Sequence, residues 1–246
     1  MKKVNAIGLL VILLSGCWDI MDISESQSST FLKFYNTYPV CTGADVKEVN
    51  GVGYAILGTV ESFTSGSQIC LARTDYFGNL LDSVRHYGNV LDDKAYCLKV
   101  LPDGGFGILG SIKNPDTDKL EVYFLRTNRV GDILWSRSIP AIGVNVEAYH
   151  FETDASGSFY MTGYAERSST QTDKQIWIYA LNSEGEDLWP AARTFGGEKD
   201  EEAHHLQILS DGKLIITGHT KSYPSGTLIN HIFLLKTNSS GLTVAF

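Results

Sequence analysis

An internal repeat is the feature that most constrains how this chain can fold. The segment GYAILGT at Gly53–Thr59 returns three times, as GFGILGS, SFYMTGY and KLIITGH, and its last glycine lies at positions 58, 110, 163 and 218. A turn glycine follows each copy, at positions 78, 131, 185 and 241. Ala95, Ala148 and Ala203 each lie 15 residues before the last glycine of their own copy, and Gly43 holds that place in the first copy. Three markers in one register predict four copies of a single structural unit.

Each copy has the pattern of strands. In the second copy a strand pattern at 95–101 leads into the turn sequence PDGG, and the β-rich run at 106–111 follows it. Apolar residues alternate along 121–128, and NRVGD then forms a second hairpin turn before 133–139. No copy keeps an apolar period of 3.6 residues over three helical turns. The unit is therefore predicted to be a four-stranded antiparallel meander with about the length of a propeller blade.

The stretch GFGILG at 105–110 fits the glycine pattern of a dinucleotide-binding turn. Such a turn must open a helix whose N-terminus meets the phosphates, whereas here Pro115 and several turn-forming residues follow. The other copies also lack one or more of the glycines. We therefore expect Gly105 and Gly107 in a strand and its entry turn, and Gly110 where two sheets approach closely. The stretch predicts no nucleotide binding.

The N-terminus has the proportions of a secretory signal. Lys2 and Lys3 precede an apolar run at 6–14, which is too short to span a bilayer as a helix. The Leu-Ser-Gly-Cys that ends at Cys17 resembles the lipobox of bacterial lipoproteins. The resemblance implies that residues 1–16 are a signal peptide and that acyl chains on Cys17 hold the protein in a membrane. The alternative is an ordinary signal peptide followed by a chance cysteine.

Residues 17–30 read as a flexible, acidic tether. Loss of residues 1–16 takes two lysines away, so the formal net charge changes from −8 to −10. A charge of this sign excludes nucleic acid as an expected partner. Asp19, Asp22 and Glu25 follow the cysteine closely and resemble the surface-export signals of some Gram-negative outer-membrane lipoproteins. The resemblance implies the outer membrane and the cell surface, and the alternative is a solvated tether.

Three cysteines remain after Cys17. Cys41, Cys70 and Cys97 cannot all pair within the chain, and none has the spacing of a metal or redox motif. Free thiols on strands are expected, while a bridge between Cys41 and Cys97 stays open.

The ends of the repeat predict how a ring could close. The run at 31–35 has the phase of a fourth strand, because the fourth strands of other copies end near Tyr87 and Phe195. The last copy stops as its own fourth strand begins, at GLTV. An N-terminal strand is therefore predicted to complete the last of four blades. Two alternatives remain, namely that 241–246 fills that place itself, or that an open set of four blades dimerises to hide its ends.

The unit DGGF…GS…N..GD.LW resembles the β-propeller repeats of about 50 residues found in secreted and lipid-anchored bacterial proteins. The resemblance covers residues 31–246. It implies an all-β propeller of four blades, each with four antiparallel strands. It says little of function, since such propellers are binding platforms, scaffolds and occasionally enzymes. Trp135 and Trp189 each follow a turn glycine by four residues and are expected to pack between blades.

The best metal-like cluster is GGEKDEEAHHL, which contains His204 and His205. Adjacent side chains on a strand point to opposite faces, so the two rings cannot easily hold one ion. In register with the repeat, His204 stands where Tyr96 and Tyr149 stand, which indicates a packing position. No metal and no cofactor are expected, and no common hydrolase motif is present. Carboxylates from different blades could still form a pair in space.

In a propeller, the loops from the fourth to the first strand and from the second to the third emerge on one face. Acidic and aromatic residues gather in these loops, and such a face suits a cation, a basic peptide or a glycan. A solvated rim is the alternative. The candidate binding residues are Asp93, Glu147, Asp200, Glu202, Phe63 and Tyr223.

Together these patterns predict a non-catalytic, lipid-anchored propeller at the outer membrane, exposed on the cell surface. Its membrane contact would be the acylated Cys17, and its ligand an unidentified protein or glycan. A periplasm-facing scaffold for envelope proteins is the first alternative. A hydrolase with acidic residues at the centre of the propeller is the second.

Overall fold

The computed structural model describes residues 30–35, 40–61, 66–89, 91–141, 144–223 and 229–243. The chain divides into two compact units, residues 1–34 and 35–246. In the first unit only residues 30–34 are described, and they form no strand. The expected signal peptide, the lipid site at Cys17 and almost all of the tether lie outside the described residues.

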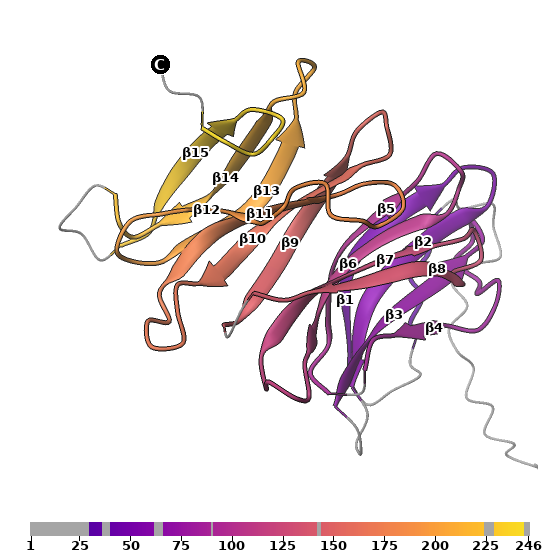
Figure 1. The fold of residues 1–246 in the computed structure, drawn as a ribbon. Coiled ribbons are helices and arrows are strands. Elements are labelled where there is room, and N and C mark those ends of the chain that lie inside the picture. Colours follow the sequence, from indigo (N-terminus) through magenta and orange to yellow (C-terminus); the bar gives the residue numbers. More distant parts are fainter. Residues whose placement is uncertain are drawn as a thin grey trace, which may run out of the picture. The chain divides into compact units, whose positions relative to one another are not determined.

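The second unit contains strands in four antiparallel sheets that follow one another along the chain (Figure 1). The first sheet consists of β1 (Val40–Val49), β2 (Gly53–Glu61), β3 (Ser67–Thr74) and β4 (Arg85–Tyr87). The second consists of β5 (Lys94–Val100), β6 (Phe106–Lys113), β7 (Leu120–Thr127) and β8 (Ile133–Ile139). The third consists of β9 (Val146–Thr153), β10 (Phe159–Glu166), β11 (Lys174–Leu181) and β12 (Arg193–Phe195). The fourth consists of β13 (Glu201–Ile208), β14 (Leu214–Thr220) and β15 (His231–Thr237).

The predicted all-β architecture is confirmed as four antiparallel sheets, with three strands described in the last one. In every sheet each strand pairs with its neighbour in the chain, as a meander requires. The described part of the chain has no helix long and apolar enough to cross a membrane.

The repeat markers occupy one register in all four sheets. The glycines at 58, 110, 163 and 218 lie opposite Gly43, Ala95, Ala148 and Ala203, respectively. Immediately after this pair the first strand of every sheet carries one residue more than its partner. Such a β-bulge leaves the extra residue unpaired and re-aims its side chain. The extra residues are Ala44, Tyr96, Tyr149 and His204.

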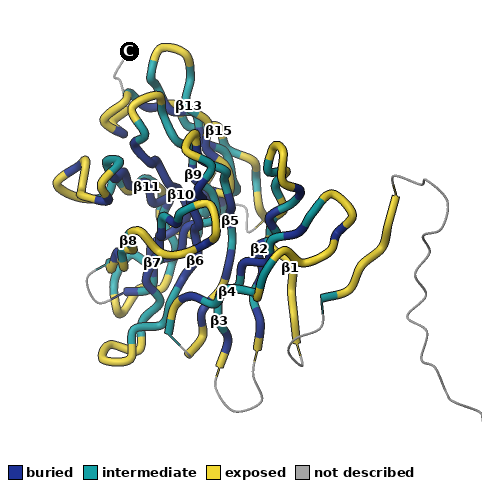
Figure 2. The backbone as a smooth tube through the Cα atoms, turned by 90° about the vertical axis from the view of Figure 1, so that its right-hand side faces the viewer, coloured by how far each residue is buried: buried dark blue, intermediate teal, exposed yellow. Residues whose placement is uncertain are grey.

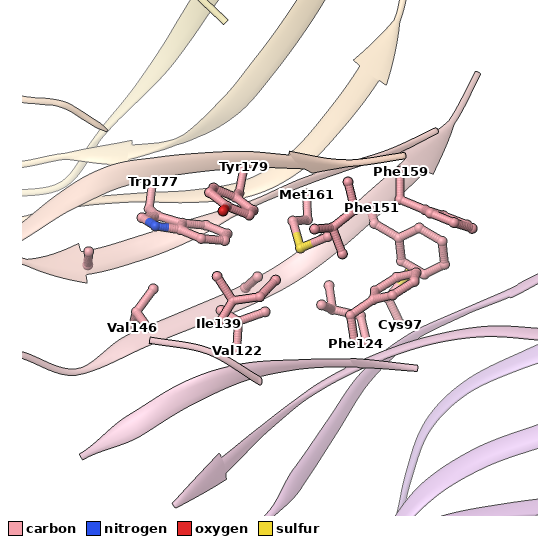
Figure 3. Packing of buried hydrophobic residues seen from close by; sticks show 14 of the residues in the cluster. Cys97, Val122, Phe124, Ile139, Val146, Phe151, Phe159, Met161, Trp177 and Tyr179 are labelled. Carbon is pink, nitrogen blue, oxygen red and sulfur yellow. The ribbon is translucent and has the colours of Figure 1, made fainter. Parts of the chain in front are cut away.

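Apolar cores lie between successive sheets and hold them together. Figure 3 shows the core between the second and third sheets, where Val122 and Phe124 meet Phe151, Phe159 and Met161. The rings of Phe124 and Phe151 cross edge to face at 5.0 Å. Equivalent cores join the first sheet to the second and the third to the fourth. Burying one such side chain stabilises the fold by about 1.5–3 kcal/mol, so the packing of sheet on sheet dominates stability.

The GFGILG stretch lies in the entry turn and strand of β6, and no helix begins there. A Cβ on Gly107 would lie 2.9 Å from the Phe151 ring of the third sheet. A Cβ on Gly110 would lie 2.5 Å from Ile69 of the first sheet. These glycines therefore permit close approach of neighbouring sheets, as expected.

Trp135 and Trp189 pack in the cores between sheets, as predicted. Trp135 on β8 lies against Phe124 and Phe159, with ring centroids 5.7 and 5.8 Å apart. Trp189 is buried and meets Tyr160 edge to face at 5.9 Å.

A recurrent contact joins an outer residue to the turn glycine of the next sheet. The Tyr87 hydroxyl donates to the Gly131 carbonyl at 2.7 Å, from the first sheet to the second. The Tyr35 hydroxyl donates to the Gly78 carbonyl of the first sheet at 2.8 Å. Tyr35 thus makes the same contact with the first sheet that Tyr87 makes with the second. This agrees with the fourth-strand phase of the segment that ends at Tyr35.

Closure of a ring is not seen in the described residues. Residues 30–35 and 241–243 form no strand, and the fourth sheet ends at β15. The N-terminal strand that would complete the last blade stays a prediction.

No disulfide joins Cys41 to Cys97, so the bridge that the sequence left open is not formed. Cys41 is exposed on β1, Cys70 is half-buried on β3 and Cys97 is buried on β5. Burial raises the pKa of the Cys70 thiol to about 11. Cys70 is therefore an unreactive thiol at neutral pH.

Candidate functional site

The bulges of three neighbouring sheets bring their extra side chains into one row, called here the ring row. It consists of Tyr96 on β5, Tyr149 on β9 and His204 on β13. The Tyr96 and Tyr149 rings meet edge to face at 5.1 Å, and Tyr149 stacks on His204 at 5.3 Å. At the far end, Nε2 of His204 lies 3.1 Å from Nδ1 of His219 on β14. Tyr96 and Tyr149 are half-buried, whereas His204 is exposed, so the row opens to solvent at its histidine end.

Two carboxylates stand beside the row at the same place in the repeat. Glu147 on β9 and Glu202 on β13 each lie directly before the alanine marker of their sheet. Each accepts a hydrogen bond from the row tyrosine of the preceding sheet. The Tyr96 hydroxyl donates to Oε1 of Glu147 at 2.5 Å, and the Tyr149 hydroxyl to Oε2 of Glu202 at 3.3 Å. The arrangement at one sheet junction is therefore repeated at the next.

Glu147 is buried and surrounded by hydroxyl donors. Besides Tyr96, the Tyr164 hydroxyl donates to Oε2 at 2.8 Å and the Ser111 hydroxyl to Oε1 at 3.2 Å. Three donors suit an ionised carboxylate, which can only accept. Burial first, and then the charge of Glu147, raise the pKa of both Tyr96 and Tyr164 above the ordinary value. Both phenols therefore remain protonated as donors.

Glu202 has a different environment, because a cation reaches it. Nζ of Lys174 on β11 lies 2.7 Å from Oε1 of Glu202 and also 3.9 Å from the centroid of the Tyr164 ring. The Glu202 side chain is partly exposed. Beside it, partial desolvation of the ring and then the neighbouring His219 lower the pKa of His204, which favours the neutral imidazole.

His204 and His205 point to different neighbours, as adjacent strand residues should. His205 lies against the His150 ring at 3.8 Å, while His204 stacks on Tyr149. Both histidines thus contact rings of the third sheet, and both are exposed to solvent. Where the chain is described, no group of three or more His, Cys, Asp and Glu side chains could hold a metal ion.

Asp93, a candidate binding residue, is buried just before β5. Neither of its carboxylate oxygens has a hydrogen-bond partner among the described residues. Burial raises its pKa to about 7, and the backbone groups of Asn89 and Lys113 offset only part of this rise. Asp93 therefore belongs to the interior and not to an exposed face.

Asp200, Tyr223 and Phe63 are not part of the ring row. Asp200 pairs with Nζ of Lys221 at 2.8 Å, which lowers its pKa, and it accepts the Lys174 backbone N–H at 3.1 Å. Tyr223 is exposed in the loop after β14. Phe63 lies outside the described residues. Of the six candidates, Glu147 and Glu202 are the two that contact the row tyrosines.

Sequence reasoning missed the role of the residues around these carboxylates. The repeat aligns Tyr96, Tyr149 and His204 and by itself indicates only packing positions. Ser111 and Lys174 carry no signal of their own in the sequence. The signal that was present is the residue directly after each alanine marker, which is aromatic in the last three copies.

No protein-family model matches the chain, and no curated protein matches it. Solved structures with a similar fold include a thermostable family-43 glycoside hydrolase, at 12% identity over 83% of this chain and 71% of that chain, with a TM-score of 0.47. A levansucrase of B. megaterium has 9% identity, the same two coverages and a TM-score of 0.46. An endo-arabinase of Bacteroides thetaiotaomicron has 17% identity over 77% of this chain and 72% of that chain, with a TM-score of 0.40.

These findings correct the expectation of a non-catalytic module. The expectation rested on the fold and on missing motifs, yet the three solved structures named above are enzymes by name. At these identities the likeness is one of fold alone and gives this chain no activity. The chemistry available to this chain lies in the ring row and its two carboxylates.

Proposed function

We propose that the chain is a hydrolase that acts on carbohydrate and that its chemistry depends on Glu147 and Glu202. One observation carries the proposal. Two carboxylates stand at the same repeat position of neighbouring sheets, each bonded to a tyrosine of one aromatic row. Glycoside hydrolysis commonly needs two carboxyl groups that come from different elements of the fold.

The two carboxylates differ in surroundings, and different surroundings allow different roles. Glu202 is partly exposed and paired with Lys174, so water can reach its carboxylate. It is suited to take a proton from an attacking water molecule. Glu147 is enclosed by hydroxyl donors, and its fixed charge can stabilise positive charge that develops on a sugar ring.

The ring row supplies a surface for the substrate. Sugar rings have apolar faces that pack on aromatic side chains, and Tyr149 and His204 are already parallel, with an interplanar angle of 11°. His204 lies at the exposed end of the row. We therefore place the entry for a saccharide at this end, next to Glu202.

The test is a hydrolysis assay of the purified chain on a panel of polysaccharides and aryl glycosides, with reducing ends as the readout. Glu147→Gln and Glu202→Gln should each lower kcat by about 100-fold or more. Glu152→Gln is the matched control, because Glu152 lies on the same strand β9 but pairs with Lys99 at 2.7 Å. It should leave kcat unchanged.

Thermal unfolding of each variant separates lost chemistry from lost folding. The proposal fails if the parent chain hydrolyses nothing on the panel. It also fails if folded Glu147→Gln and Glu202→Gln proteins remain as active as the control.

We also propose that acylated Cys17 anchors the protein in the outer membrane with the sheets outside the cell. The lipobox-like sequence and the acidic residues behind it support this. Radiolabelled palmitate should enter the parent protein and not Cys17→Ser. A protease added to intact cells should digest the protein while a periplasmic control survives. Equal labelling of both proteins, or digestion only after lysis, would contradict the anchor or the outward orientation, respectively.

A further inference from the structure

On the third strand of each sheet, two positions flank the residue that pairs with the repeat glycine. Their side chains are buried in the first three sheets and exposed in the fourth. In the first three sheets they hold Ile69 and Leu71, Val122 and Phe124, and Ile176 and Ile178, all at most 5% exposed. On β15 they hold Ile232 and Leu234, which are 89% and 73% exposed. Side chains of the following sheet cover the first three pairs. The fourth sheet therefore presents the same apolar face with nothing described that covers it.

The first sheet presents the complementary face. In each later sheet, three apolar residues of the first and second strands cover the preceding sheet, and all are at most 2% exposed. They are Leu98, Phe106 and Ile108 in the second sheet, Phe151, Phe159 and Met161 in the third, and Leu206, Leu214 and Ile216 in the fourth. In the first sheet these three positions hold Val46, Tyr54 and Ile56. Val46 is 57% exposed, and the other two are half-buried. Figure 2 shows the exposure along β1. One chain thus carries both halves of a sheet junction that it does not itself form.

Hydrogen bonds between neighbouring sheets also recur at one position of the repeat. Oδ2 of Asp45 in the first sheet accepts the Leu98 N–H of the second at 2.9 Å. Nδ1 of His150 in the third sheet accepts the Leu206 N–H of the fourth at 3.3 Å. His205 holds this position in the fourth sheet. A second copy of the first sheet would bring its Val46 N–H to this position, and within one copy that N–H donates to Oδ1 of Asp45 at 2.8 Å.

We propose that a second copy of this chain covers the exposed face of the fourth sheet with its own first sheet, and that the first copy does the same in return. The two copies then form a two-fold ring of eight sheets, within the usual size range of propellers. A second copy is favoured because the complementary face exists on this chain, while Ile232 and Leu234 stay uncovered within one copy. The contact of Tyr35 with Gly78 shows that the first sheet already receives a residue where a preceding sheet would place one.

The second copy would also extend the ring row, although the dimer does not depend on the proposed hydrolysis. The row ends at His204, and the next sheet would bring Ala44 of the second copy to the bulge position and Thr42 to the carboxylate position. Both side chains are small. The junction between copies would thus leave room beside His204.

The first test is the mass of the full-length Cys17→Ser chain in a mild detergent, measured by light scattering over a range of concentrations. We expect two chains per particle. Leu234→Arg should raise the concentration at the monomer–dimer midpoint by about tenfold or more, because it places a charge in the apolar junction. Leu134→Arg is the control, since Leu134 is an exposed residue of β8 outside both faces, and it should remain dimeric. A parent chain that is monomeric at every concentration overturns the proposal.

The second test distinguishes a second copy from closure within one chain. In a background of Cys17→Ser and Cys41→Ser, chains with Val46→Cys and chains with Leu234→Cys are mixed under mild oxidation. Disulfide-linked heterodimers are expected from this pair but not from Val46→Cys mixed with Leu134→Cys. The proposal is overturned if the mixture gives no link while a single chain with both Val46→Cys and Leu234→Cys forms an internal one.

Discussion

The third and fourth sheets are two copies of one unit with the same register and the same bulge, yet their surroundings differ. Ile178 on β11 is fully buried, whereas Leu234 at the corresponding place on β15 is 73% exposed. Glu147 is enclosed by three hydroxyl groups, whereas Glu202 is paired with Lys174 and partly exposed. The repeat thus determines how each strand is built, and the neighbouring sheet determines what each side chain contributes to stability.

The largest effect should separate Ile178→Ala from Leu234→Ala. The first change leaves a cavity in a packed core and should lower the free energy of unfolding by about 2–5 kcal/mol. The second removes an exposed side chain and should lower it by about 0.5 kcal/mol or less at a concentration where the chain is monomeric. Urea unfolding followed by tryptophan fluorescence measures both. Equal losses would show that the fourth sheet is covered even in the monomer.

Removal of Glu147 and removal of Glu202 should lower the free energy of unfolding by different amounts, with the larger loss again in the third sheet. Glu147→Ala leaves the Tyr96, Ser111 and Tyr164 hydroxyls without their acceptor, and should lower the free energy of unfolding by about 1–3 kcal/mol. Glu202→Ala should cost less, since its partners Lys174 and Tyr149 can turn to water. The free energies of unfolding of the two variants are again measured by urea unfolding. A larger loss for Glu202→Ala would reverse the assignment of enclosed and open carboxylates.

A pH-dependent effect should distinguish Asp93 from Glu201, which hold the same repeat position in the second and fourth sheets. Glu201 accepts from Thr220 at 2.8 Å and from the Gly197 N–H at 2.8 Å, whereas neither carboxylate oxygen of Asp93 has a hydrogen-bond partner in the described part of the chain. The folded-state pKa of Asp93 is raised from 3.8 to about 7. Stability from this group is therefore fully present below about pH 3.8 and is lost as pH rises through about 7.

Asp93→Asn should accordingly raise the free energy of unfolding at pH 8 by about 1–2 kcal/mol and change it little at pH 4. Melting temperatures at the two pH values test this. A variant that is less stable than the parent at pH 8 would mean that the ionised carboxylate has a partner there.

The smallest effect should come from the hairpin of the fourth sheet. Nζ of Lys213 lies 2.6 Å from Asp211, but both side chains are largely exposed to solvent. Lys213→Ala should change the free energy of unfolding by less than about 0.5 kcal/mol. A loss above about 1 kcal/mol in urea unfolding would show that this turn contributes more to the fourth sheet than an exposed ion pair can.

The strands and their grouping into four sheets could be predicted because both depend on local pattern. Turn glycines and alternating apolar residues determine where each strand begins and ends. The bulges escaped prediction, since one extra residue within a strand leaves the apolar pattern almost unchanged. Closure depends on which faces meet in space, and residues 31–35 have the phase of a strand without forming one.

The site could be predicted only in part, for a physical reason. Glu147 and Glu202 stood out as acidic residues next to the repeat markers. Asp93 stood out in the same way, yet it is buried. A Cβ on Gly88 would lie 2.2 Å from Oδ2 of Asp93, so this glycine makes the space that the carboxylate fills. Such a fit between distant residues has no counterpart in a single sequence.

The extra residue of each bulge has no partner in the ladder of its own sheet. Exchange at this place leaves the strand pairing within each sheet unchanged and alters the ring contacts between neighbouring sheets. The chain has used this freedom, since Ala44, Tyr96, Tyr149 and His204 differ while their flanking markers are nearly constant. One unpaired residue per copy is enough to make four similar sheets chemically unequal, and it is the natural position at which to redesign what the molecule recognises.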